Sequence, residues 1–171
     1  MDIWYLALRI VHVVGAAFWF GAGLALVGYV EPAAGEAGPE GQRLMGRLVR
    51  RGLPVAMNSA AVLTVLAGIA LYWRASGGFQ SAEWMQTSAG TAFGVGGVVG
   101  LLAVVLGGAV TGPTAAAIGK LGAAIQAQGG PPTPEQQTRL AALQGRYRMS
   151  ARVNVALVAL AMLLMASARA L

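Results

Sequence analysis

Residues 3–29 read IWYLALRIVHVVGAAFWFGAGLALVGY, and this apolar run decides the class of fold. As a helix it would be about 40 Å long at about 1.5 Å per residue, which is enough to cross a bilayer core of about 30 Å. Its charged and ionisable side chains are Arg9, near the start, and His12, the single histidine of the chain. We therefore expect a first membrane span over about residues 3–30.

His12 lies inside this run, where an ionisable side chain is costly and becomes a candidate functional group. At helical steps of three and four, Tyr5, Gly15, Ala16 and Trp19 share its face. We interpret the two small residues as leaving room beside the imidazole for a flat ligand, framed by the two aromatic rings. The alternative is that His12 hydrogen-bonds a neighbouring helix and that the small residues only allow helices to approach closely.

The rest of the chain is equally apolar. Of its 171 residues, 57% are hydrophobic and 11% are charged, with a mean hydropathy of +0.65, whereas soluble domains are about 25% charged. The absence of cysteine excludes disulfides, thiolate metal sites and iron–sulfur clusters. The net charge of +6 comes from basic residues beside apolar runs, not from a basic surface interleaved with aromatics, so we expect no nucleic-acid binding.

Three further spans are expected, at about 53–74, 88–112 and 152–169. Between the last two, a helical hairpin is expected at about 114–150. The sequence thus predicts an all-α, polytopic membrane protein, a four-transmembrane-helix bundle with helical extensions, in a single domain over 1–171. Its third span is rich in glycines four residues apart, a pattern typical of close packing with other helices.

The segments outside the spans carry start and stop signals. EPAAGEAGPEGQ, residues 31–42, predicts a loop because of its glycines and prolines. From Gln42 one helix is expected to continue through the second span, kinked at Pro54. Thr133, followed by Pro134 and then Gln136, predicts a capping box at the start of the last helix.

Basic residues predict the orientation. Four Lys or Arg residues fall in 31–52 and five in 113–152, against only Arg9, Arg74 and Arg169 on the other side. By the positive-inside rule, we expect a multi-pass protein of the cytoplasmic (inner) membrane with both termini outside and the hairpin in the cytoplasm.

The first two spans resemble those of a superfamily of small four-helix membrane proteins that includes the copper-resistance D-like proteins and the HemJ-type protoporphyrinogen oxidases. The resemblance covers about residues 3–73. In the first span it rests on His12 followed by Trp19, Phe20 and Gly21 or Gly23. In the second span it rests on Arg47, Pro54, Thr64 and Gly68. The HemJ-type enzymes carry a lysine after a tryptophan at the start of the third helix, whereas Trp84 is followed here by Met85.

The resemblance implies that His12 is an axial ligand of a b-type haem, with Tyr5, Gly15, Ala16 and Trp19 lining the site. Met162 is a candidate second metal ligand, because a His–Met pair is a known haem ligation mode. The alternatives are that Met162 is apolar filler or that a second copy of the chain offers its own His12. Copper is disfavoured by scattered methionines and a single histidine.

Two functional readings remain open. One is a small haem-binding or redox-associated membrane protein centred on His12. The other is a cofactor-free accessory subunit that packs with other membrane proteins, or with itself, through the glycine-rich third span and the cytoplasmic hairpin. No nucleophile–base pair, phosphate loop or proton-relay chain is evident, so the sequence does not favour an enzyme.

Overall fold

The computed structural model describes residues 2–168 and 170, and its regular structure there is helical throughout. Four helices are long and apolar enough to cross a membrane. Two of them contain a short π-helical segment. They are α1 (Ile3–Ala25) with η1 (Leu26–Val30) and α2 (Glu31–Glu36), then α4 (Leu53–Ala75), then α6 (Ser88–Leu106) with η2 (Gly107–Thr111) and α7 (Gly112–Ala127), and finally α8 (Pro134–Ser167). The shorter helices are α3 (Pro39–Arg50) and α5 (Ala82–Gln86).

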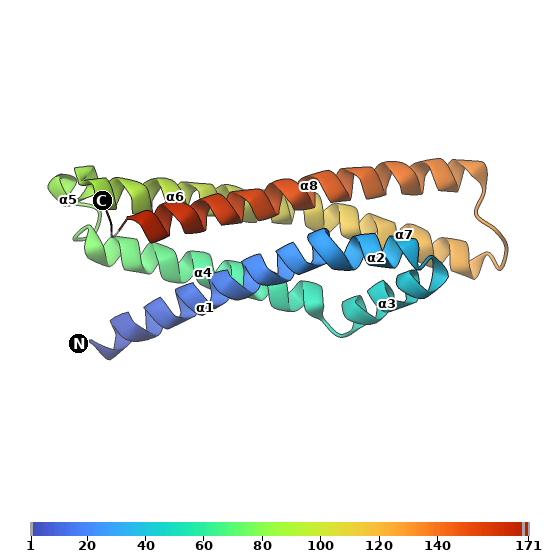
Figure 1. The fold of residues 1–171 in the computed structure, drawn as a ribbon, viewed down its shortest axis with the longest axis horizontal. Coiled ribbons are helices and arrows are strands. Elements are labelled where there is room, and N and C mark those ends of the chain that lie inside the picture. The colour runs from blue at the N-terminus through green and yellow to red at the C-terminus, as the bar shows by residue number, and fades with distance from the viewer. Residues whose placement is uncertain (1, 169, 171) are drawn as a thin grey trace.

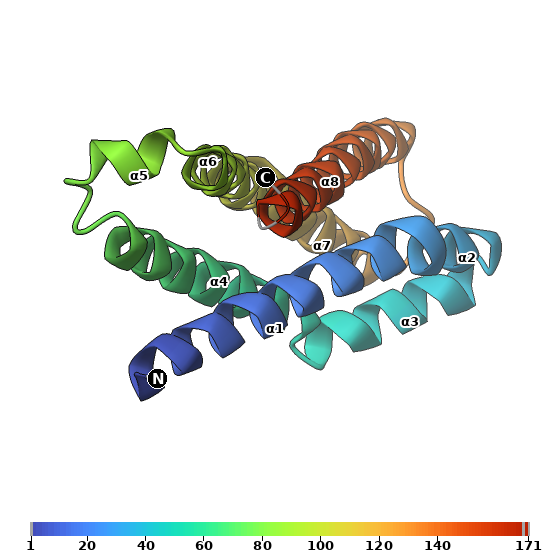
Figure 2. The ribbon, with the colours of Figure 1, turned by 60° about the vertical axis from the view of Figure 1, so that its left-hand side comes forward.

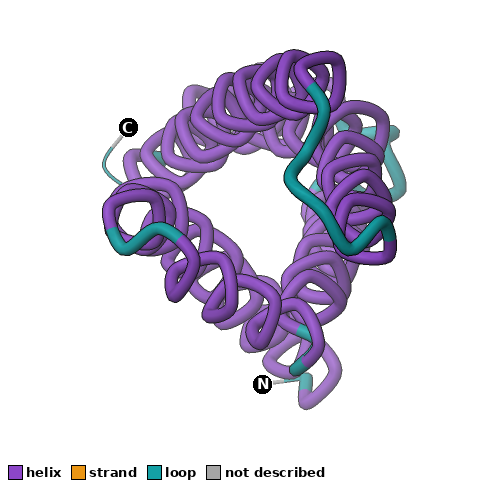
Figure 3. Tube along the Cα trace, turned by 90° about the vertical axis from the view of Figure 1, so that its right-hand side faces the viewer, coloured by secondary structure: helices purple, strands orange, loops and turns teal. Residues whose placement is uncertain are grey.

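The long helices form one elongated bundle (Figure 1). Helix α1 packs along α4, and α6 packs along α8; the two pairs join because α1 also contacts α8 and α4 also contacts α6. Viewed along the bundle, the long helices surround a common axis (Figure 3). The start of α1, α5 and the end of α8 lie at one end, whereas α2, α3, α7 and the first half of α8 form the other (Figures 1 and 2).

The two helix pairs share one construction. On α1, a Cβ added to Gly15 would lie 3.4 Å from Ala60 O of α4. On α6, a Cβ added to Gly96 would lie 3.3 Å from Ala161 O of α8. Each glycine precedes the π-helical segment of its own helix by the same number of residues. The chain is therefore built as two similar helical hairpins, a repeat that is not evident in the sequence.

Both π-helical segments come just before a proline. Pro32 and Pro113 lie in the first turns of α2 and α7. A proline inside an α-helix lacks an N–H and clashes with the carbonyl one turn back. Here the preceding turn is widened: Glu31 N bonds Leu26 O, and Gly112 N bonds Gly107 O. The wider turn accommodates the proline ring, so both helices continue where a simple α-helix would break.

Two sequence predictions fail on the second quarter of the chain. The predicted loop 31–42 is wrong, because the first helix continues to Glu36 and α3 starts at Pro39. The predicted continuous helix from Gln42 is also wrong. It is divided into α3 and α4 at Gly52, whose φ of +82° is a left-handed conformation that favours glycine. Pro54 consequently lies in the first turn of α4, where it causes no kink.

The last helix follows its predicted signals. Thr133 accepts a hydrogen bond from Gln136 N, and the Gln136 side chain accepts one from Thr133 N, so the predicted capping box is confirmed. Helix α7 and the first half of α8 form the expected hairpin. The structure ends α8 at Ser167, and the predicted end at Arg169 lies outside the described residues.

The interior is small and made largely of small side chains. Ala61, Ala103 and Val158 pack around Trp19 where the helices meet. Most large apolar side chains, by contrast, lie on the outside of the bundle. One interhelical polar contact is short: Asn154 Nδ2 on α8 donates to Ala103 O on α6 at 2.6 Å. Close backbone approach with an apolar exterior is the pattern of helices that pack in lipid.

Candidate functional site

His12 on α1 faces α4 and is held by its backbone. Its Nδ1 lies 2.8 Å from the main-chain oxygen of Thr64, and because a carbonyl only accepts, Nδ1 carries the proton and donates it. The ring also lies against Gly68, one turn further along α4. A Cβ at Gly68 would be 2.8 Å from His12 Cε1 and 3.0 Å from Nδ1, so a side chain at this position would displace the imidazole.

Gly15, one turn after His12, is packed against the same stretch of α4. A Cβ at Gly15 would collide with Thr64 Oγ1. Thr64 is only 5% exposed, and its hydroxyl oxygen is buried without a hydrogen-bond partner among the described residues. The room that the sequence suggested beside Gly15 is thus filled by α4, as in the alternative interpretation of close helix packing.

Tyr5 belongs to a different cluster, near the end of the bundle. Its ring lies between two guanidinium groups, with centroid distances of 5.8 Å to Arg9 and 5.6 Å to Arg74. Arg74 also forms an ion pair with Asp2 at 2.8 Å. This arrangement holds the start of α1 against the end of α4, and it gives Tyr5 neighbours other than His12.

Trp19 and Met162 lie in the core. Trp19 is 9% exposed and belongs to the cluster with Ala61, and Met162 packs against that cluster from α8. Ala16 is half-buried on α1. Of the predicted site residues, the structure therefore brings His12 and Gly15 together at α4, and it gives Tyr5, Trp19 and Met162 other neighbours. Ligation by Met162 stays a prediction.

The second ring nitrogen of His12 is the reactive atom of this site. Nε2 makes no hydrogen bond with the described residues, and it is not fully enclosed by protein atoms. A neutral imidazole with its proton on Nδ1 has its lone pair on Nε2. Histidines that bind metals are oriented in this way, with the other nitrogen donating to a carbonyl or carboxylate. The site can therefore accept a hydrogen bond or donate an electron pair to a metal.

Protein ligands for a bare metal ion are scarce. Within residues 2–168 and 170, no group of three or more His, Cys, Asp or Glu side chains could hold a metal ion. A haem iron differs from a bare ion because the macrocycle itself supplies four nitrogen ligands, so one histidine from the protein is enough to attach it. The donor atoms around His12 fit this kind of metal centre better than a metal cage.

Two contacts of His12 were within reach of the sequence. Thr64 and Gly68, which carried the resemblance in the second span, are the residues that hold the imidazole. Periodicity within one helix could not pair them with His12, since the pairing depends on how α1 and α4 are aligned.

Glu31 was missed as an interior residue, because it was predicted to lie in a loop. It continues the first long helix, and its Oε1 is buried without a hydrogen-bond partner among the described residues. The side chains near its carboxyl group come from α8 and are Tyr147, Arg148 and Arg152. The sequence signal that could have placed it is the pair Glu31-Pro32, which starts α2 with proline in its first turn.

Comparison with protein-family models, with curated proteins and with solved structures finds no match to this chain. The resemblance to the copper-resistance D-like and HemJ-type proteins therefore stays a prediction from the residues of the first two spans.

Proposed function

We propose that this protein is a multi-pass protein of the cytoplasmic membrane, with both termini outside and the α7–α8 hairpin in the cytoplasm. The four long apolar helices support insertion. The nine basic residues in 31–52 and 113–152 support the orientation, because they gather at the end formed by α2, α3, α7 and the first half of α8.

The absence of cysteine makes the orientation directly testable. Glu83→Cys places one thiol on α5, and Gly130→Cys places one in the turn between α7 and α8. A membrane-impermeant maleimide added to intact cells, after the outer membrane has been made permeable, should label the first variant and not the second. Labelling of Gly130→Cys before cell lysis would reverse the orientation.

Within this membrane protein, we propose that His12 Nε2 is an axial ligand of a b-type haem. The observation that carries the proposal is the hydrogen bond from Nδ1 to Thr64 O at 2.8 Å, which fixes the tautomer and leaves the Nε2 lone pair without a protein partner. An unpaired polar atom is costly in an apolar membrane, so a ligand for Nε2 would be stabilising.

The chain supplies orientation more than enclosure. Thr64 O and Gly68 hold the imidazole, but α4 fills the space beside Gly15, so a haem would approach from the side of Nε2. When bound, a haem supplies one-electron redox chemistry. The second axial position falls to Met162 or to His12 of a second copy of the chain.

The test is an absorption spectrum of the detergent-purified protein, oxidised and dithionite-reduced, after haem has been supplied during expression. We expect a Soret band in the wild type. It should be lost in His12→Ala and also in His12→Gln, in which an amide can still donate to Thr64 O while offering no imidazole nitrogen. Thermal unfolding of each variant separates loss of the ligand from loss of the fold.

Met162→Leu distinguishes the second ligand. A spectral shift in this variant supports His–Met ligation, whereas an unchanged spectrum that depends on dimer formation supports two His12 ligands. A colourless wild type under these conditions would contradict the haem proposal.

The second candidate function is a cofactor-free accessory subunit, and a specific observation favours it. Gly97, Gly100 and Gly108 of the third long helix have no other residue within 4 Å of an added Cβ among the described contacts. Small residues on an open face allow a further helix to approach closely. In this reading His12 serves only to join α1 to α4, and Nε2 is satisfied by the partner or by water.

For this candidate the expected result is a colourless protein that purifies with a membrane partner. Gly100→Leu should reduce that association, whereas Val98→Leu, at a neighbouring exposed position of the same helix, should leave it unchanged. Equal association of both variants would contradict a role for the glycine face.

A further inference from the structure

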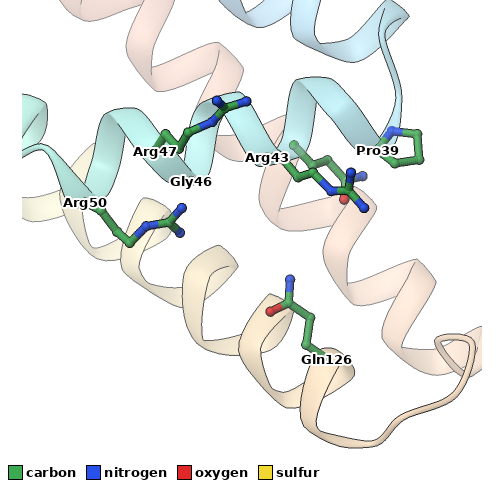
Figure 4. A pocket seen from close by; sticks show the side chains of 7 residues that line it. Pro39, Arg43, Gly46, Arg47, Arg50 and Gln126 are labelled. Carbon is green, nitrogen blue, oxygen red and sulfur yellow. The ribbon is translucent and has the colours of Figure 1, made fainter.

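The strongest unassigned feature outside the His12 site is a basic cavity between α3 and α7. Its volume is about 500 Å³. Arg43, Arg47 and Arg50 line it from α3, and Gln126 lines it from α7. Figure 4 shows Arg50 and Gln126 extending from their two helices into the space between them. The remaining lining residues are Pro39, Gln42 and Gly46.

The charges of this cavity are uncompensated. No acidic residue lines it, and none of its three arginines forms an ion pair with another residue that the structure describes. Their sequence spacing of four and three places them on one face of α3, so their guanidinium groups repel one another. An anion within the cavity would remove that repulsion.

The donor set indicates which anion. All charged groups of the cavity are arginines, whose planar guanidinium donates two parallel hydrogen bonds to phosphate or carboxylate oxygens. Gln42 and Gln126 add amide donors. A phosphate group, with several acceptor oxygens and up to two negative charges, satisfies more of these donors than a carboxylate does. The volume also lies in the range of ligand sites, about 300–1,000 Å³.

The position of the cavity relates it to the membrane. Arg50 is the last residue of α3, and Leu53 begins the apolar helix α4 after a two-residue turn. One end of the cavity therefore lies where α4 enters its apolar stretch, at the level expected for phospholipid headgroups. Basic pockets on the cytoplasmic side of membrane helices bind such headgroups.

We propose that this cavity binds a phosphate group, and that the phosphate is either the headgroup of an anionic phospholipid or a soluble phosphate compound. The phospholipid source rests on the proposed membrane insertion; the phosphate chemistry does not, and neither depends on haem. Topology alone does not explain the arrangement, because the positive-inside rule requires basic residues in the segment but not their convergence on one cavity.

Arg51 provides a matched control. It neighbours Arg50, has the same charge and contributes equally to orientation, but it does not line the cavity. The experiment compares the wild type with Arg43→Gln, Arg47→Gln and Arg51→Gln, each as the full chain in lipid nanodiscs. Glutamine keeps a good helix propensity, so α3 should persist in each variant. Thermal unfolding in phosphatidylcholine alone checks that it does.

The lipid arm counts phospholipids retained by the protein in native mass spectrometry after reconstitution with phosphatidylcholine and phosphatidylglycerol. The soluble arm titrates inorganic phosphate and pyrophosphate into phosphatidylcholine nanodiscs and follows the melting temperature. Loss of one charge-assisted pair should weaken binding about tenfold. We therefore expect about tenfold weaker binding for Arg43→Gln and Arg47→Gln and no change for Arg51→Gln.

The two arms identify the source. Selective retention of phosphatidylglycerol that depends on Arg43 and Arg47 supports a lipid headgroup. Stabilisation by phosphate or pyrophosphate with the same arginine dependence, and no selective lipid retention, supports a soluble ligand. Equal loss in the Arg51→Gln control, or no response in either arm, would overturn the proposal. A colourless protein would leave it intact, so its outcome is separate from that of the haem test.

Discussion

Replacing Gly15 by alanine is expected to loosen the pairing of α1 and α4. The added Cβ would collide with Thr64 Oγ1 and would lie 3.4 Å from Ala60 O, which is main chain and cannot rotate away. Overpacking of this kind costs about 1–3 kcal/mol. Alanine regains about 0.5–1 kcal/mol of helix preference over glycine. The net loss in the free energy of unfolding should therefore be about 1 kcal/mol, with an upper value of about 2 kcal/mol.

Two further variants make the measurement specific. Gly21→Ala changes the same residue type on the same helix, but its new Cβ would meet nothing within 4 Å, so it should not destabilise. Thr64→Ala removes a hydroxyl that has no partner among the described residues, so alone it should cost little. In the double variant with Gly15→Ala, it should recover most of the loss.

The assay is reversible unfolding of the full chain in detergent micelles with increasing dodecyl sulfate, followed by tryptophan fluorescence. If Gly15→Ala and Gly21→Ala unfold alike, or if Thr64→Ala adds to the loss instead of relieving it, then α1 and α4 are not aligned as described. The contact between His12 and Thr64 would then be in doubt as well, because both contacts depend on the same alignment.

Three other substitutions test separate contacts. Asn154→Leu should lower stability by about 1 kcal/mol in the same unfolding assay, because it removes the 2.6 Å hydrogen bond to Ala103 O and leaves that carbonyl without this donor. Thr133→Ala should cost about 1 kcal/mol by removing the cap of α8, and hydrogen exchange should show faster opening confined to the first turn of that helix. Asp2→Asn keeps a side chain able to cap α1 but removes the charge paired with Arg74; because both side chains are substantially exposed, the melting temperature should change little, by an amount corresponding to less than about 1 kcal/mol.

The apolar helices were predictable because their cause is local. A run such as residues 3–29 has few alternatives to a helix once its length and hydropathy are given, and the capping box at Thr133 specifies where α8 starts. The failures had local causes as well. Pro32 was read as the end of a helix, but the π-helical turn before it removes the steric conflict. A one-residue change in hydrogen-bond register leaves no clear mark in composition.

The candidate site was only partly predictable. Helical spacing correctly placed Gly15 on the face of His12, but it could not show that α4 covers this face. The identity of the covering residues depends on the alignment of α1 with α4, which is set by contacts between segments about fifty residues apart along the chain. The basic stripe of α3 was visible in the sequence, whereas its position opposite Gln126 required the packing of α3 beside α7.

The two π-helical turns also have a mechanical consequence. Each occurs at a comparable place in its long helix, between the stretch that packs in the α1–α4 or α6–α8 pair and the extension that follows. A widened turn followed by a proline has fewer regular hydrogen bonds to resist bending than a standard α-helical turn. The pair η1 and η2 thus forms a matched set of joints. Through them a force on the α2–α3 and α7 extensions would tilt these parts while the paired stretches, including the His12 contact with α4, stay in register.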